Sequence, residues 1–136
     1  MFIIGDVGNT QSKFAFYDSK KNKIINLINF DSSGLDKNKK FIRFINKKNI
    51  TNAVITSVVP KVFLKIKKLF IKKNIKCFEL LDAKLKNPIK ININKPKQVG
   101  SDRIANVIAA YNSHKTNCIV VDFGTATTFD ILTGKG

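Results

Sequence analysis

The chain has 136 residues, which is enough for one ordinary domain, or for one complete lobe and part of a second. Hydrophobic residues make up 43% of it and include 11 phenylalanines, a composition that supports a packed core and excludes wholesale disorder. The formal charge of +16 would suit an acidic partner, but nearly all the basic residues are lysines spread along the chain. Proteins that recognise nucleic acids usually have arginines and aromatic residues clustered on one face, and the sequence shows no such cluster. We therefore expect a solvated lysine-rich surface and no specific nucleic-acid partner.

The cysteines and the N-terminus indicate the cellular setting. Cys77 and Cys118 are far apart and lack the spacing of a metal site, which is typical of reduced intracellular thiols. The N-terminal apolar run is too short for a signal peptide and is broken by Asp6, and no segment is long enough to span a membrane. We therefore expect a soluble, cytoplasmic protein without a membrane partner.

The first stretch of the chain predicts a strand, a tight turn and a second strand. An apolar run ends at Asp6, small polar residues follow, and apolar residues resume at Phe14. We expect Gly8 to adopt a positive φ, so that successive backbone N–H groups can converge on an anion, with Asp6 holding a metal ion against it. The stretch lacks the P-loop pattern, and an ordinary Asp-x-Gly turn would have the same sequence.

The next part of the chain predicts two strand–helix–strand units. Apolar patterning, together with a proline that can start the second helix, indicates a strand at 23–30, a helix at about 35–48, a strand at 52–57, a helix at 60–73 and a strand at 76–81.

Residues 84–97 contain two prolines, which exclude a helix across them and predict an extended segment. A helix should follow from Ile104 to about Tyr111, with Ser101 as its N-cap and Asp102 in its first turn. Capping is sufficient to explain Asp102 at this point. We expect His114 to lie exposed in the polar link that follows.

The stretch from Cys118 to Asp130 repeats the design of the opening stretch. An apolar strand ends in Asp122-x-Gly124, and a threonine-rich turn leads to a second strand. One such hairpin could be an ordinary turn, but a duplicated lobe that binds a nucleotide between its copies would produce two.

Four motifs in this order and spacing resemble the type III pantothenate kinase family. They are Asp6 to Thr10, Ser57 to Pro60, Pro96 to Arg103 and Asp122 to Thr128. The resemblance implies an α/β fold, an actin-like ATPase or ribonuclease-H-like lobe at 1–115, with only the first hairpin of a second lobe at 116–136. It also implies a homodimer where the second lobe is present.

The family resemblance further implies a reaction and its cofactors. The reaction is ATP-dependent phosphorylation of pantothenate to 4'-phosphopantothenate, the first step of coenzyme A biosynthesis, with Mg²⁺ and a monovalent cation, K⁺ or NH₄⁺. Asp102 would be the general base and catalytic residue, and Asp6 would lie near Mg²⁺. Asp122 would help bind the monovalent cation, and Thr125 would contact the ATP phosphates.

Two sets of residues would bind the substrates of this reaction. The ATP phosphate loop would comprise Asp6, Val7, Gly8, Asn9, Thr10, Gln11, Ser12 and Lys13. The pantothenate contacts would come from Gly100, Ser101, Asp102 and Arg103. A carboxylate at a helix start can accept a proton from a primary hydroxyl, and Arg103 can bind an anion, so the chemistry agrees with these roles.

The sequence departs from the family pattern at two places. Ile93 stands where the family commonly has an aromatic residue, usually Tyr, in the pantothenate pocket. The resemblance also covers only the N-terminal half of a usual member, so we expect an incomplete second lobe with exposed apolar hairpin faces.

Two alternatives remain open on the sequence alone. In a ribonuclease-H-like nuclease, Asp6, Asp102 and Asp122 would hold two metal ions and the lysines would hold nucleic acid. A non-catalytic remnant or interaction module would bind ATP without turnover.

Overall fold

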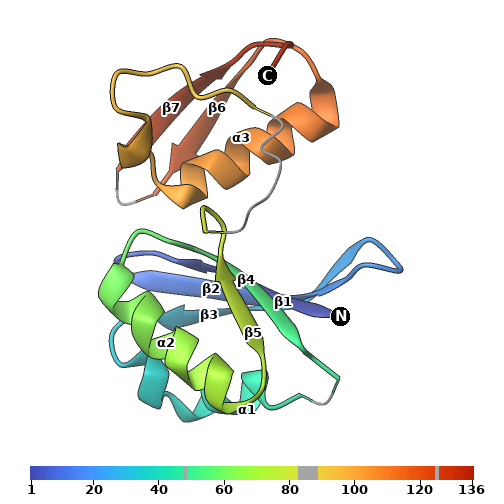
Figure 1. Ribbon diagram of the computed structural model, residues 1–136, viewed down its shortest axis with the longest axis vertical. Helices are drawn as coiled ribbons and strands as arrows, with labels where there is room; N and C mark the ends of the chain where they lie inside the picture. Colours follow the sequence, from blue (N-terminus) through green and yellow to red (C-terminus); the bar gives the residue numbers. More distant parts are fainter. Residues whose placement is uncertain (48, 83–88, 125) are drawn as a thin grey trace. The chain divides into compact units, whose positions relative to one another are not determined.

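The computed structural model describes residues 1–47, 49–82, 89–124 and 126–136. Contacts divide the chain into two compact units, residues 1–83 and residues 84–136. The first unit holds a five-stranded sheet of order β3-β2-β1-β4-β5, and the second holds the two-stranded sheet β6-β7 (Figure 1).

The first unit is a mixed sheet with helices. Its elements in chain order are β1 (Phe2–Val7), β2 (Gln11–Asp18), β3 (Lys23–Asp31), the 3₁₀ helix η1 (Leu35–Lys37), α1 (Lys39–Ile45), β4 (Asn52–Ser57), α2 (Pro60–Lys72) and β5 (Lys76–Glu79). Strands β1, β2 and β3 pair antiparallel, whereas β4 pairs parallel with β1 and β5 parallel with β4. The five predicted strands and the second predicted helix are therefore confirmed.

The helix predicted at 35–48 is interrupted. A 3₁₀ turn ends at Lys37, and α1 begins after Asn38, whose side-chain oxygen accepts hydrogen bonds from the backbone N–H groups of Lys40 and Phe41. This cap satisfies donors that a helix start leaves without partners, so it begins a new helix where the periodicity predicted a continuous one. The predicted end at Lys48 lies outside the described residues.

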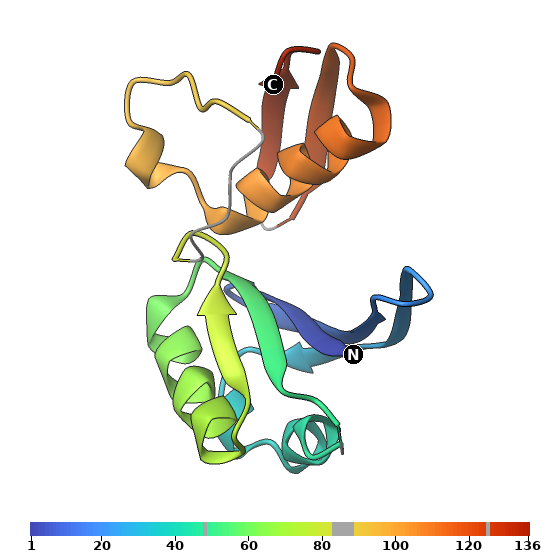
Figure 2. The same ribbon diagram turned by 45° about the vertical axis from the view of Figure 1, so that its right-hand side comes forward.

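The core of the first unit lies on one face of the sheet. Side chains alternate between the faces of a strand, and Ile3, Val7, Phe14 and Phe16 are buried together in one cluster. Helices α1 and α2 cover this face of the sheet (Figures 1 and 2). Phe14 packs against Phe41 with ring centroids 4.7 Å apart. The Phe14 ring is therefore packed inside a cluster of apolar side chains, as in a close-packed protein interior.

Gly5 lies in the middle of β1 where no side chain fits. A Cβ atom there would lie 2.5 Å from two carbons of the buried Phe14 ring and 2.9 Å from Cδ1 of Ile55. We expect Gly5→Ala to lower the free energy of unfolding by about 1–3 kcal/mol, as overpacking of a core does. Urea unfolding of the two proteins measures this difference. Gly124→Ala serves as control, because its Cβ would make only an ordinary 3.6 Å contact. Equal unfolding midpoints for Gly5→Ala and the parent chain would contradict the prediction.

The second unit combines a helix with a hairpin. Its elements are η2 (Pro96–Gln98), α3 (Ser101–His114), β6 (Cys118–Phe123) and β7 (Thr127–Leu132), and β6 pairs antiparallel with β7. Both hairpin strands are confirmed. The extended segment predicted at 84–97 contains the start of a short 3₁₀ helix, and its part at 84–88 lies outside the described residues.

Two details of α3 differ from the prediction. Gly100 is the N-cap, and no side chain caps the helix, so the prediction of Ser101 as N-cap is wrong by one residue. Ser101 is instead the first helical residue and is buried. The helix also extends to His114, which lies in its last turn, where a basic side chain complements the helix dipole.

The β6–β7 hairpin has one covered and one open face. Helix α3 contacts both strands, and Leu132 on the covered side is buried. The apolar residues of the other face are 40–83% exposed, and they are Ile119, Val121, Phe123, Phe129 and Ile131. The expectation of exposed apolar residues on this hairpin is confirmed.

The contacts group α3 with β6 and β7, whereas the predicted lobe at 1–115 grouped it with the first sheet. The lobe boundary at 115/116 stays a prediction. Within the described part of the chain, no helix is both long and apolar enough to cross a membrane. Both cysteines are free thiols, and burial raises the pKa of Cys77 to about 12, so this thiol stays protonated at neutral pH.

Candidate functional site

The turn between β1 and β2 is closed by its backbone. The N–H of Gly8 donates to the carbonyl oxygen of Gln11 at 3.1 Å. Asn9, Thr10 and Gln11 are exposed. The expected positive φ at Gly8 is wrong, because positive φ among the glycines occurs only at Gly34 and Gly136 within the described residues. Glycine is required for another reason: a Cβ at Gly8 would lie 2.7 Å from the Gln11 carbonyl oxygen.

Asp6 lies at the end of β1 on the face opposite the core. The register pairs it with Lys13 of β2 and Thr56 of β4, so these three side chains share that face. The Thr56 hydroxyl donates to Oδ1 of Asp6 at 2.9 Å. A carboxylate, a hydroxyl and an ammonium group therefore occur together beside the turn, which is a suitable donor set for a phosphate with its metal ion.

Two residues of the predicted phosphate loop point the other way. Val7 and Ser12 are fully buried in the core, and the Ser12 hydroxyl is hydrogen-bonded to the Ser32 hydroxyl at 2.8 Å. These side chains cannot reach a ligand at the exposed turn. Any contribution of Val7 and Ser12 to binding must come through the backbone.

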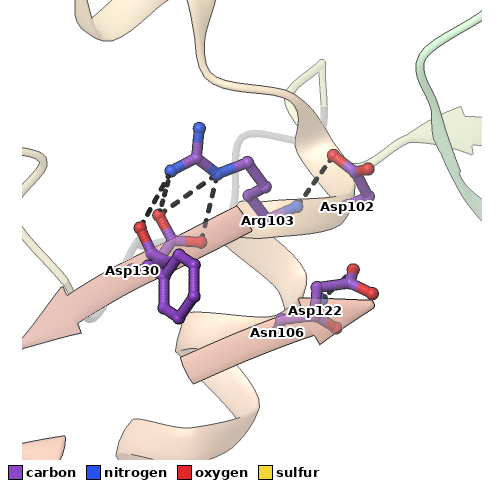
Figure 3. Close-up of polar contacts among 6 residues, drawn as sticks. Asp102, Arg103, Asn106, Asp122 and Asp130 are labelled. Atoms are coloured by element: carbon purple, nitrogen blue, oxygen red, sulfur yellow. Dashed lines mark hydrogen bonds and ion pairs between the residues drawn. The ribbon is translucent and has the colours of Figure 1, made fainter. Parts of the chain in front are cut away.

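In the second unit, the start of α3 carries the predicted base and the predicted anion-binding residue. Asp102 is half-buried, and its Oδ1 accepts a hydrogen bond of 2.8 Å from the Arg103 backbone N–H. This contact is consistent with a helix-start role for Asp102 and leaves its other oxygen, Oδ2, without a hydrogen bond within the described residues. Figure 3 shows the Asp102 carboxylate apart from the Arg103 guanidinium.

Arg103 is held by Asp130 of β7. Its Nε donates to both carboxylate oxygens of Asp130, at 3.2 and 3.1 Å, and its Nη2 donates to Asp130 Oδ1 and to the Phe129 carbonyl oxygen (Figure 3). These hydrogen bonds raise the pKa of the Arg103 guanidinium above its ordinary value. The third nitrogen, Nη1, has no hydrogen bond to the described residues, so it can still donate to a ligand.

Arg103 and Asp130 form part of the wall of a cavity of about 310 Å³ in this unit. Aliphatic residues supply much of the remaining wall, and they include Ile89, Ile91, Ile93, Val99, Ile104 and Val107. Ile93, at the position that is usually aromatic in the resembled family, is 54% exposed and lines this cavity. Such a cavity suits a small ligand with an apolar body and an anionic end.

The remaining predicted site residues lie near these elements. Asp122 is half-buried at the end of β6 and accepts a hydrogen bond of 3.1 Å from the Asn106 side chain of α3. Gly100 and Ser101 form the N-terminus of α3. Thr125 lies outside the described residues.

Each unit brings together part of the predicted site. The first unit contains the predicted loop and Asp6, and the second unit contains Asp102, Arg103 and Asp122. The partners of these residues were not predicted from the sequence, namely Thr56, Asn106 and Asp130. Of these, only Asp130 had a local signal, since it ends the second hairpin motif.

These observations define an α/β protein that has a candidate anion-binding turn and a candidate substrate cavity. The sequence profile of type III pantothenate kinase matches residues 2–136, so the chain belongs to this family. The fold class of an α/β protein with a mixed sheet agrees with that assignment.

Individual relatives agree with the family match. The type III pantothenate kinase of Pelagibacter ubique is 44% identical over 97% of this chain, and that of Persephonella marina is 36% identical over 98%. The chain spans 54% and 56% of the length of these two relatives. Among solved structures, the fowlpox virus Holliday junction resolvase is similar over 69% of this chain and 67% of its own, but 20% identity and a TM-score of 0.36 are too low to establish a common fold.

Proposed function

We propose that this chain provides the phosphate loop, the pantothenate pocket and the general base of a kinase that phosphorylates pantothenate to 4'-phosphopantothenate with ATP. The observation that carries the proposal is the cavity of about 310 Å³, where Arg103 lies among aliphatic side chains. Arg103 directly follows Asp102, the proposed base, in the sequence. Family membership gives the reaction its name. The geometry of the second unit supports the roles proposed below for its residues.

Pantothenate fits the chemistry of this cavity. It carries a carboxylate at one end, and a dimethyl-substituted carbon beside its primary hydroxyl at the other. The free Nη1 of Arg103 can donate to an anionic or polar oxygen of the substrate, while Ile93, Val99 and Val107 can bury its apolar carbons. Ile93 would thus make an aliphatic contact in place of the aromatic one expected in the family.

Asp102 would act as the general base. Its carboxylate would accept the proton of the primary hydroxyl as that oxygen forms a bond to the γ-phosphorus of ATP and the bond to ADP breaks. The hydrogen bond from the Arg103 backbone occupies only one oxygen of the carboxylate. The other oxygen has the lone pairs that this proton transfer needs.

The turn at Gly8 to Gln11 would receive the ATP phosphates, with the exposed Asn9, Thr10, Gln11 and Lys13 as donors. Asp6 would hold Mg²⁺ together with phosphate oxygens, and Asp122 would help bind K⁺ or NH₄⁺. Bound Mg²⁺ supplies neutralisation of the phosphate charge. Thr125 is assigned to the phosphates from the resemblance alone.

The sheet order β3-β2-β1-β4-β5, with only β2 antiparallel to the rest, supports a ribonuclease-H-like lobe of the actin-like ATPases. The homodimer and the cytoplasmic location stay predictions from the sequence. The family match to type III pantothenate kinase disfavours the nuclease alternative.

The direct test is formation of 4'-phosphopantothenate from ATP and pantothenate, followed by chromatography. We would assay the chain alone and a fusion to the C-terminal portion of the Pelagibacter ubique relative, because the chain spans 54% of that protein. The fusion should produce 4'-phosphopantothenate in an ATP- and Mg²⁺-dependent manner. No product from a folded fusion, alongside an active Pelagibacter enzyme, would reject the proposal.

A further inference from the structure

Ser32 contacts the proposed phosphate turn from the buried side, through two hydrogen bonds. Its backbone N–H donates to the Thr10 carbonyl oxygen at 2.9 Å, and its hydroxyl donates to the Gly8 carbonyl oxygen at 2.6 Å. Ser32 follows β3 and is 24 residues from Gly8 in sequence. One residue therefore holds two of the carbonyl groups of this turn.

A third contact connects Ser32 to Ser12 in the core. The two hydroxyl oxygens are 2.8 Å apart, and the residues are 2% and 0% exposed. Because the single hydroxyl proton of Ser32 is donated to Gly8, the Ser12 hydroxyl must donate to Ser32. The result is a chain of two hydrogen bonds, from Ser12 to Ser32 to the Gly8 carbonyl, in a water-excluded place where such bonds strengthen one another.

This chain of bonds determines which way the turn presents its backbone donors. In a trans peptide the N–H of Asn9 points opposite to the carbonyl of Gly8, and no peptide bond of the described residues is cis. With the Gly8 carbonyl directed at Ser32, the Asn9 N–H is directed away from the core. Asn9 and Thr10 are exposed on that outer side.

We infer that Ser32 is a positioning residue for nucleotide binding, which keeps the turn in the conformation that receives the phosphates. This inference rests on the proposed function, since it concerns the same turn. Ser32 itself is buried and does not touch the ligand. Its effect is transmitted through the carbonyl groups of Gly8 and Thr10.

The test is the dissociation constant of the chain for ATP with Mg²⁺, measured by isothermal titration calorimetry. We expect Ser32→Ala to bind ATP about tenfold more weakly, because the part-buried Gly8 carbonyl loses its partner and the turn relaxes. Ser32→Thr, which keeps the hydroxyl, should recover most of the affinity. Ser33→Ala is the matched control, because Ser33 is the exposed neighbouring serine, and it should bind like the parent chain.

Calorimetry also separates positioning from simple loss of folded protein. Unfolded chains lower the binding stoichiometry, whereas a displaced turn raises the dissociation constant at unchanged stoichiometry. Parental affinity in a folded Ser32→Ala would overturn the inference while leaving the proposed function standing. If the parent chain binds no ATP, the phosphate-turn assignment fails, and the inference fails with it.

A second variant decides the matter should Ser32→Ala not fold. Ser12→Ala removes the hydrogen bond from the Ser12 hydroxyl to Ser32. It keeps the hydrogen bond from the Ser32 hydroxyl to the Gly8 carbonyl oxygen. It should weaken ATP binding about threefold, since the remaining bond loses only its cooperative support. An unchanged dissociation constant for Ser12→Ala would then overturn the inference.

Discussion

Replacing Asp102 with Asn should lower kcat for pantothenate phosphorylation in the fusion protein by about 10²-fold or more, the usual contribution of a general base. The amide keeps an oxygen that can accept the Arg103 N–H, so the start of α3 should remain intact. It cannot accept the hydroxyl proton. Steady-state kinetics with saturating ATP and pantothenate measure this loss.

Asp36→Asn provides the matched control for Asp102→Asn. Asp36 is also a carboxylate in the first turn of a helix, but it lies in η1 of the first unit. Its replacement should leave kcat unchanged. If Asp102→Asn kept full kcat, Asp102 would be a helix-start residue only, with a stability contribution of about 0.3–1 kcal/mol.

Replacing Asp130 with Asn should raise KM for pantothenate about tenfold, with a smaller change in kcat, because the Arg103 guanidinium loses a charged partner and its fixed orientation. The pair is partly exposed, with side-chain exposures of 36% for Arg103 and 18% for Asp130. Its contribution to the free energy of unfolding should therefore stay within about 1 kcal/mol. Initial rates over a range of pantothenate concentrations measure KM.

The ATP kinetics of the same variant act as an internal control. KM for ATP should not change with Asp130→Asn, because neither Arg103 nor Asp130 belongs to the proposed phosphate turn. Asp31→Asn, which removes an exposed carboxylate at the end of β3, controls for the loss of one negative charge. An unchanged KM for pantothenate in Asp130→Asn would mean that Arg103 binds no substrate, or that its orientation does not depend on Asp130.

Some features of this site were predictable from short stretches of sequence. A short apolar run identified the strand from 52 to 57, and the helical period identified the helix that begins at Pro60. The polar turns after the two Asp-x-Gly motifs were also predictable, because turn residues act locally. Asp102 in the first turn of a helix followed from the same local chemistry.

Local patterns failed where another local interaction competed with them. The helix expected from Leu35 was interrupted because the Asn38 side chain captures two backbone N–H groups and begins α1 at Lys39. The expected positive φ at Gly8 was wrong for a similar reason. Glycine is common at such turns for its conformational freedom, but here the nearby Gln11 carbonyl excludes a side chain.

The sequence by itself determined the strands, the two hairpin motifs and the carboxylate at the helix start, because each depends on residues close together in the chain. Only the tertiary structure decided which side chains hold the site residues: Ser32 lies 24 residues from Gly8, Asp130 lies 27 from Arg103, and Thr56 lies 50 from Asp6. Such partners are set by strand register and by the packing of helix on sheet. Neither leaves a repeating pattern in the sequence, so the supports of the turn at Gly8 and of Arg103 became visible only in the folded chain.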